Sequence, residues 1–145
     1  MISNFLAYLV GLLGGVAVGF QSPIAGSMGQ KVGGTASSFL VHLSGMVLSG
    51  LLLIFRGGEN IRSWQQLPWY AFLSGGFGLI LFLTINYTLP KLGSTMMITL
   101  IIIGELMIGI IVDHFGWFGV TVRQIDLPRI VGVLLLFGGG YLISR

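Results

Sequence analysis

The amino-acid sequence predicts an all-α integral membrane protein in which five helices cross the bilayer. Of the 145 residues, 54% are hydrophobic and only 8% are charged, whereas a soluble domain carries about a quarter charged residues. Nearly all the charged residues lie between long apolar runs, where they cost least if the runs lie in hydrocarbon. Stretches such as MMITLIIIG are apolar on every side, as a helix surrounded by lipid and other helices requires.

The predicted spans follow from the lengths of the apolar runs. A helix needs about 20 residues to cross about 30 Å of hydrocarbon. Runs of that length, bounded by charged residues, Pro or Gly, form a single membrane domain over residues 1–145. The five predicted spans are Asn4 to Ser22, Thr35 to Phe55, Pro68 to Leu89, Ser94 to Val112 and Pro128 to Ser144.

Proline and aromatic residues support the ends of these spans. Pro68 and Pro128 each stand at a predicted helix start, where a missing N–H costs nothing, and Pro90 is expected to stop the third helix. Aromatic side chains favour membrane interfaces. Those near the predicted ends are Trp64, Trp69, Tyr70, Trp117 and Phe118. The first run lacks a positively charged segment before it, so we expect a retained helix and not a cleaved signal peptide.

The positive charges are nearly balanced between the two sides of the predicted bundle. One side receives Lys31, Lys91 and Arg145, and the other receives Arg56, Arg62, Arg123 and Arg129. The positive-inside rule therefore gives little orientation bias, and we expect insertion in both directions. An antiparallel homodimer would then reproduce the inverted repeat of many transporters. The alternatives are one fixed orientation or a paired chain of opposite topology.

Small residues predict close packing of the helices. Helices in lipid gain little from hydrophobicity and associate through small residues that let their backbones approach. The chain contains 24 glycines. Gly11, Gly15 and Gly19 recur on one face of the first predicted helix, and we expect this face to be a packing seam.

Glu105 is the strongest candidate for a functional residue. It lies in IIIGELMIGII, near the middle of the fourth predicted span, where an acidic residue costs about 2.5 kcal/mol or more. Such a carboxyl can hold a proton while the site is empty and release it when a cation arrives. The alternative is a protonated acid that makes one hydrogen bond between helices.

The second predicted helix has a polar or small face. Ser38, His42, Gly45 and Ser49 follow one another at spacings of four, three and four, which places them on one side. In a cavity, His42 would exchange protons near neutral pH or bind substrate, with Ser38 and Ser49 as supporting donors. A structural hydrogen bond is an equal alternative. The expected depths of His42 and Glu105 allow them to share a site.

Other polar residues lie near the predicted helix ends. Asn86 and Tyr87 are candidates to line an entrance, or to cap backbone groups at the interface. Asp113 and His114 end the fourth predicted span, where a structural role is favoured over a metal or acid–base pair. We predict no metal site, and without cysteine we expect no cofactor.

Several function classes do not fit the sequence. The formal charge of +3 is too small and scattered for a nucleic-acid surface. The sequence has no phosphate-binding glycine loop, no nucleophile elbow and no HExxH motif, so we do not expect an enzyme.

Four segments are distinctive. They are GLLGGVAVGFQSPIAGSMGQKVG, SSFLVHLSG, LPKLGSTMMITLIIIGELMIGIIVDHFGWFG and RIVGVLLLFGGGYLISR. With these segments, and with LPKLG and DHFG as the most specific parts, the chain resembles the half-length, YdcZ-like branch of the bacterial drug/metabolite transporter superfamily. The resemblance implies a five-helix unit, half of a ten-helix transporter, that works as an inverted dimer or with a paired chain. It also implies the bacterial cytoplasmic membrane and small organic solutes as substrates.

This member departs from the family pattern at ionisable positions. The family usually has glutamine in place of Glu105 and a small residue in place of His42, and Ala25 stands where the family has Asn. The sequence thus predicts a transporter of small organic solutes that works by alternating access, with a cationic substrate and proton coupling as hypotheses. The alternative is a small channel or a non-transporting subunit of a membrane complex.

Overall fold

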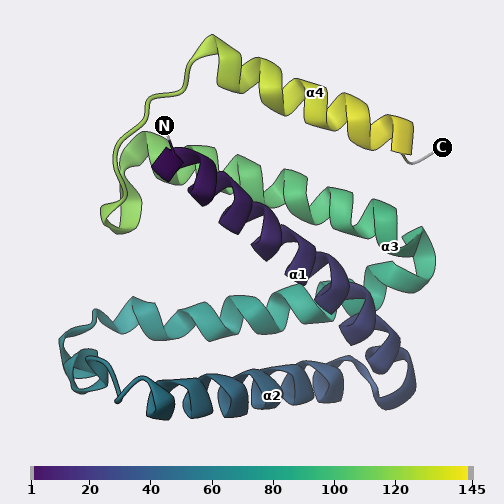
Figure 1. Ribbon diagram of the computed structural model, residues 1–145. Coiled ribbons are helices and arrows are strands. Elements are labelled where there is room, and N and C mark those ends of the chain that lie inside the picture. The colour runs from purple at the N-terminus through teal and green to yellow at the C-terminus, as the bar shows by residue number, and fades with distance from the viewer. Residues whose placement is uncertain (1, 144–145) are drawn as a thin grey trace. The chain divides into compact units, whose positions relative to one another are not determined.

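The computed structural model describes residues 2–143, which form helices and connections without any strand (Figure 1). The elements are α1 (Ile2–Val32), α2 (Gly34–Phe55), η1 (Ile61–Gln66), η2 (Trp69–Leu73), α3 (Ser74–Phe115), η3 (Trp117–Gly119) and α4 (Leu127–Ile143). The predicted all-α class is confirmed. Ser144, the predicted end of the last span, and Arg145, which enters the charge balance, lie outside the described residues.

The chain divides into two compact units, one that ends at Lys91 and one that begins at Leu92. In the first unit, α2 lies beside residues 74–91 of α3 (Figure 1). In the second unit, residues 94–115 of α3 lie beside α4, where Gly140 packs against Ile103 (Figure 1).

Three of the described helices are long and apolar enough to cross a membrane. They comprise Phe5–Val32, Gly34–Phe55 and Trp69–Phe115, and the last of these includes η2. The fourth helix, Leu127–Ile143, is also apolar but shorter. Three such helices indicate a multi-pass membrane protein.

Helix α3 is interrupted at Gly93. The backbone there has φ 72° and ψ 169°, a conformation that is essentially restricted to glycine. The expectation that Pro90 stops the third helix is wrong, because Pro90 lies inside α3 and the non-helical residue comes three positions later. The next residue is Ser94, the predicted start of the fourth span.

A hydrogen bond from α1 explains why the helix continues through Pro90. Proline has no N–H group, so the carbonyl oxygen of Asn86, four residues earlier, has no partner within the helix. The side-chain amide of Gln30 in α1 donates a hydrogen bond to this oxygen at 2.9 Å. The carbonyl group that Pro90 leaves unpaired in α3 is thus hydrogen-bonded by a side chain of α1.

Helix α1 is longer than the first predicted span. It continues beyond Ser22, through Pro23, to Val32. This second half makes close contacts: Ala25 is fully buried, and a Cβ atom at Gly29 would overlap the side-chain amide of Asn86. Tertiary packing therefore stabilises the helix despite the hydrogen bond that Pro23 removes.

The other helix limits differ less from the prediction. Helix α2 begins at Gly34, one residue before the predicted span, and α4 begins at Leu127, one residue before Pro128. Pro68 precedes the 3-10 helix η2, and the α-helix begins only at Ser74. The third apolar run therefore starts with a tighter helical turn.

The close contacts of glycine in the described residues lie outside the predicted seam. No atom lies within 4 Å of the Cβ position at Gly11, Gly15 or Gly19. The close contacts that glycine makes with a neighbouring helix occur at Gly26, Gly29, Gly34, Gly78 and Gly140. The glycine face on the first half of α1 has no close neighbour within the described part of the chain, and its role in helix packing stays a prediction.

We expect Gln30→Leu to reduce the free energy of unfolding by about 1 kcal/mol, because the carbonyl group of Asn86 loses its donor. Pro90→Ala restores a backbone N–H beneath that carbonyl, so Gln30→Leu should cost much less in the Pro90→Ala background. Unfolding of the four proteins in detergent measures this coupling as a double-mutant cycle. Equal costs in the two backgrounds would contradict the assignment.

Candidate functional site

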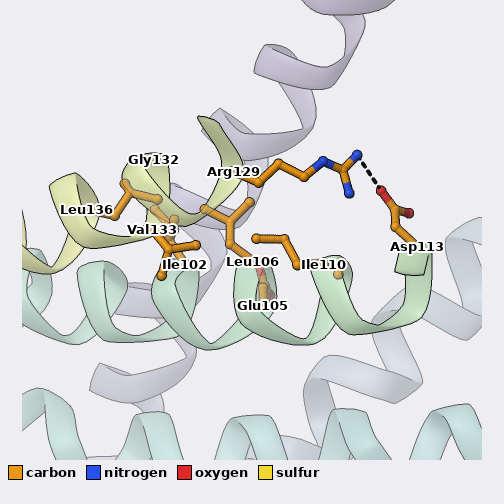
Figure 2. Close-up of a pocket in the computed structure, with 10 residues that line it drawn as sticks. Ile102, Glu105, Leu106, Ile110, Asp113, Arg129, Gly132, Val133 and Leu136 are labelled. Carbon is orange, nitrogen blue, oxygen red and sulfur yellow. Dashed lines mark hydrogen bonds and ion pairs between the residues drawn. The ribbon is translucent and has the colours of Figure 1, made fainter. Parts of the chain in front are cut away.

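The second unit contains a cavity of about 620 Å³ between α4 and residues 94–115 of α3. It is lined by Ile102, Glu105, Leu106, Gly109, Ile110, Asp113, Arg129, Gly132, Val133 and Leu136. Figure 2 shows Leu106 and Val133 between the two helices. The lining is mostly apolar, with three charged side chains.

Two glycines leave room for this cavity. Gly109 in α3 and Gly132 in α4 both belong to the lining, and no atom lies within 4 Å of either Cβ position. A larger residue at these positions would fill part of the space. Residues 105, 109 and 113 recur every four positions, so one face of α3 presents both carboxylates to the cavity.

Glu105 lies at the middle of the helical segment 94–115, and its side chain is exposed in the isolated chain. Among the residues that the structure describes, none forms a hydrogen bond or an ion pair with its carboxylate. A carboxylate at this depth of a membrane helix is costly unless it meets a proton, a cation or water.

Asp113 lies two turns nearer the end of α3 and has a partner. Its carboxylate pairs with the guanidinium of Arg129 at 3.3 Å, as Figure 2 shows, with 37% of the Asp113 side chain and 24% of the Arg129 side chain exposed. The guanidinium also donates a hydrogen bond to the carbonyl oxygen of Arg123 at 3.2 Å. These contacts fix the head of Arg129 at the Asp113 end of the cavity.

The backbone of Arg129 is held by a helix cap. The carboxylate of Asp126 accepts a hydrogen bond from the Arg129 N–H at 3.0 Å, and the Asp126 carbonyl accepts one from Ile130 at 3.2 Å. This is the position at which an acidic side chain satisfies the free N–H groups of a helix start. Asp126 therefore orients the first turn of α4.

Asp113 and His114 also hold the connection between α3 and α4. The Asp113 carbonyl accepts a hydrogen bond from the Arg123 N–H at 2.9 Å, and His114 Nδ1 accepts one from the Ile125 N–H at 3.2 Å. These contacts agree with the structural role favoured from the sequence.

His42 lies in the first unit, between α2 and α3. Its Nδ1–H donates a hydrogen bond to the Ser38 carbonyl at 2.7 Å, and the Ser38 hydroxyl lies 3.4 Å from the same nitrogen. The ring meets Phe82 edge to face at 5.5 Å, and its Nε2 would lie 2.7 Å from a Cβ at Gly78. This geometry favours the structural alternative, and a transport role for His42 stays a prediction.

Asn86 and Tyr87 occupy different environments. The Asn86 amide donates a hydrogen bond to the Phe82 carbonyl at 2.6 Å, while its Oδ1 atom is buried without a hydrogen-bond donor. The Tyr87 ring is exposed and carries the Lys91 ammonium 3.2 Å above it. Asn86 therefore packs between helices, whereas Tyr87 is open to its surroundings.

Ser49 lines another cavity in the first unit, of about 330 Å³. Its hydroxyl donates a hydrogen bond to the Met46 carbonyl at 3.2 Å. The same cavity includes Arg56 and Glu59, which form an exposed ion pair at 3.0 Å. Glu105 belongs to the second unit, so its sharing a site with His42 stays a prediction.

Arg129 was not among the predicted site residues. Two signals were available: Asp113 follows Glu105 by eight residues on one helix face, and Arg129 lies in the first turn of the next helix. In an antiparallel pair of helices, the end of one lies near the start of the next. These signals place Arg129 near Asp113, but the ion pair itself depends on how the two helices align.

Comparison with known families agrees with the resemblance seen in the sequence. A family model described as "Putative inner membrane exporter, YdcZ" matches residues 6–142. No curated protein and no solved structure matches the chain. The predicted resemblance is confirmed.

We expect Asp126→Ala to lower the free energy of unfolding by about 1 kcal/mol, because α4 loses its cap. Asp126→Asn is the matched control, since its side-chain oxygen still accepts from the Arg129 N–H while the charge is gone. Thermal unfolding in detergent compares the two variants. If Asn destabilises as much as Ala, the charge of Asp126 matters and not the cap.

Proposed function

The chain belongs to the YdcZ family, and on that premise we propose that it exports small organic cations in exchange for protons. It is a multi-pass protein of the inner membrane. In this proposal Glu105 is the carboxylate that binds the proton and the cation in turn. The observation that carries it is the position of Glu105 in the cavity of the second unit.

The cavity is suited to a small organic molecule. Its volume of about 620 Å³ lies within the range of small-molecule sites, roughly 300 to 1,000 Å³, and such sites are mostly apolar with a few placed polar groups. Apolar side chains such as Ile102, Leu136 and Val133 would contact the hydrocarbon part of a solute. Glu105 would supply the charge that selects a cation.

Electrostatics would couple the two ligands. A carboxylate in the membrane interior costs about 2.5 kcal/mol or more, and either a proton or an organic cation relieves much of that cost. Because one carboxylate is not stabilised fully by both at once, entry of the cation favours release of the proton. This competition is the basis of exchange.

We propose that the chain crosses the membrane five times, so that its helices can form a site open to one side or the other. A straight helix of the 42 residues of α3 would be roughly 60 Å long, about twice the thickness of the hydrocarbon. The interruption at Gly93 supports two crossings, by residues 74–92 and 94–115. Helix α4 would provide the fifth crossing.

The proposed working form is an antiparallel homodimer. The balanced positive charges allow insertion in both orientations, and the open face at Gly11, Gly15 and Gly19 supports close contact with a second chain. Two copies in opposite orientations would alternately expose the site to each side of the membrane.

Glu105→Gln should abolish proton-coupled transport, because the amide cannot release a proton or pair with a cation. Purified protein in vesicles that enclose a pH-sensitive dye, given a panel of small organic cations, should show saturable, cation-dependent proton movement for the unaltered protein and none for the variant. Glu59→Gln, in an exposed loop ion pair, is the control and should transport normally. Proton movement unchanged in Glu105→Gln would refute the proposal, and a cation conductance without saturation would favour a channel.

Dual orientation can be tested by cysteine labelling, since the chain contains no cysteine. Ser63→Cys places one thiol in η1, where the residue is exposed. We expect a membrane-impermeant maleimide to label about half of the molecules from each side of the membrane, since the charge bias is small. Labelling from one side alone would establish a fixed orientation.

A further inference from the structure

Three charged side chains line the cavity of the second unit. They are Glu105, Asp113 and Arg129, so the ionised cavity has two negative charges and one positive charge. One negative charge remains to be balanced by a ligand.

The positive charge forms an ion pair with only one of the two carboxylates. The guanidinium of Arg129 pairs with Asp113 at 3.3 Å and donates a hydrogen bond to the Arg123 carbonyl. The Asp126 carboxylate holds the backbone N–H of Arg129 at the same end. Glu105 lies eight residues deeper on the same helix, which is roughly 12 Å along the axis. Arg129 thus neutralises Asp113 and leaves Glu105 as the unbalanced group.

We propose that Arg129 determines the valence of the transported cation by acting as a built-in counter-ion for Asp113. When Arg129 is present, the cavity binds a solute with one positive charge, and that charge pairs with the carboxylate of Glu105. This inference rests on the proposed cation transport and names the substrate class as organic monocations.

Repulsion and desolvation give the physical reason. A solute with two positive charges would leave one of them near the guanidinium of Arg129, without a free carboxylate, in a site of low dielectric. Removal of Arg129 leaves two carboxylates about two helix turns apart. The same cavity then favours a solute whose two charges are separated by a similar length.

The test compares two probes of fixed charge on protein in lipid nanodiscs. Tetrapropylammonium carries one charge, and decamethonium carries two charges at the ends of a long methylene chain. Calorimetric titration gives the affinity of each probe. In Arg129→Gln, the affinity for decamethonium relative to tetrapropylammonium should rise about tenfold over the unaltered protein.

Further variants separate charge from structure. Asp113→Asn combined with Arg129→Gln again leaves one carboxylate, so the affinity ratio should return to that of the unaltered protein. Arg129→Lys keeps the charge and should keep the ratio, as should Arg62→Gln, which removes a charge in η1 of the first unit. Thermal unfolding confirms that each variant is folded.

The two proposals fail in different ways. If the unaltered protein binds tetrapropylammonium but the ratio is the same in Arg129→Gln, the role of Arg129 is refuted and cation transport stands. A ratio that stays high in the double variant also refutes it. If the folded, unaltered protein binds neither probe, cation transport and the role of Arg129 both fail.

Discussion

The need to satisfy every backbone polar group inside the bilayer governs much of this structure. In hydrocarbon no water replaces a missing hydrogen bond, so a proline within a helix leaves a carbonyl that another group must reach. Gln30 reaches the carbonyl of Asn86 beneath Pro90, and this contact joins α1 to α3. Where α3 is interrupted, the non-helical backbone is formed by a glycine, Gly93.

Polar side chains in membrane helices serve two purposes here. His42 and Asn86 lie against Gly78 and Gly29, where the absence of a side chain lets a polar group approach the backbone of the neighbouring helix. Glu105 instead lines a cavity and has no such neighbour among the described residues. The contrast distinguishes polar groups that pack against a neighbouring helix from one that lines a cavity.

The sequence predicted the helices well where composition alone determines them. The limits of α2 and the helix start after Gly93 were predicted to within about one residue, since apolar length and glycine decide them. The course of α1 through Pro23 was not, because contacts of Gly26 and Gly29 with α3 override the local cost of proline. The pairing of Asp113 with Arg129 was also missed, since it depends on how two helices align and not on either helix alone.

The division at Lys91 and Leu92 also bears on biogenesis. A chain is synthesised from its N-terminus, and its parts begin to fold in that order. Gly26 packs against Ile85 and Leu89, and the Ser37 hydroxyl donates a hydrogen bond to the Ala25 carbonyl; all of these residues are made before Leu92 is added. The later unit is a hairpin of consecutive helices, so its contacts need only residues made together. The helices that pack together within each unit are therefore synthesised one after another. Neither unit has to wait for a distant part of the sequence before its helices can pack.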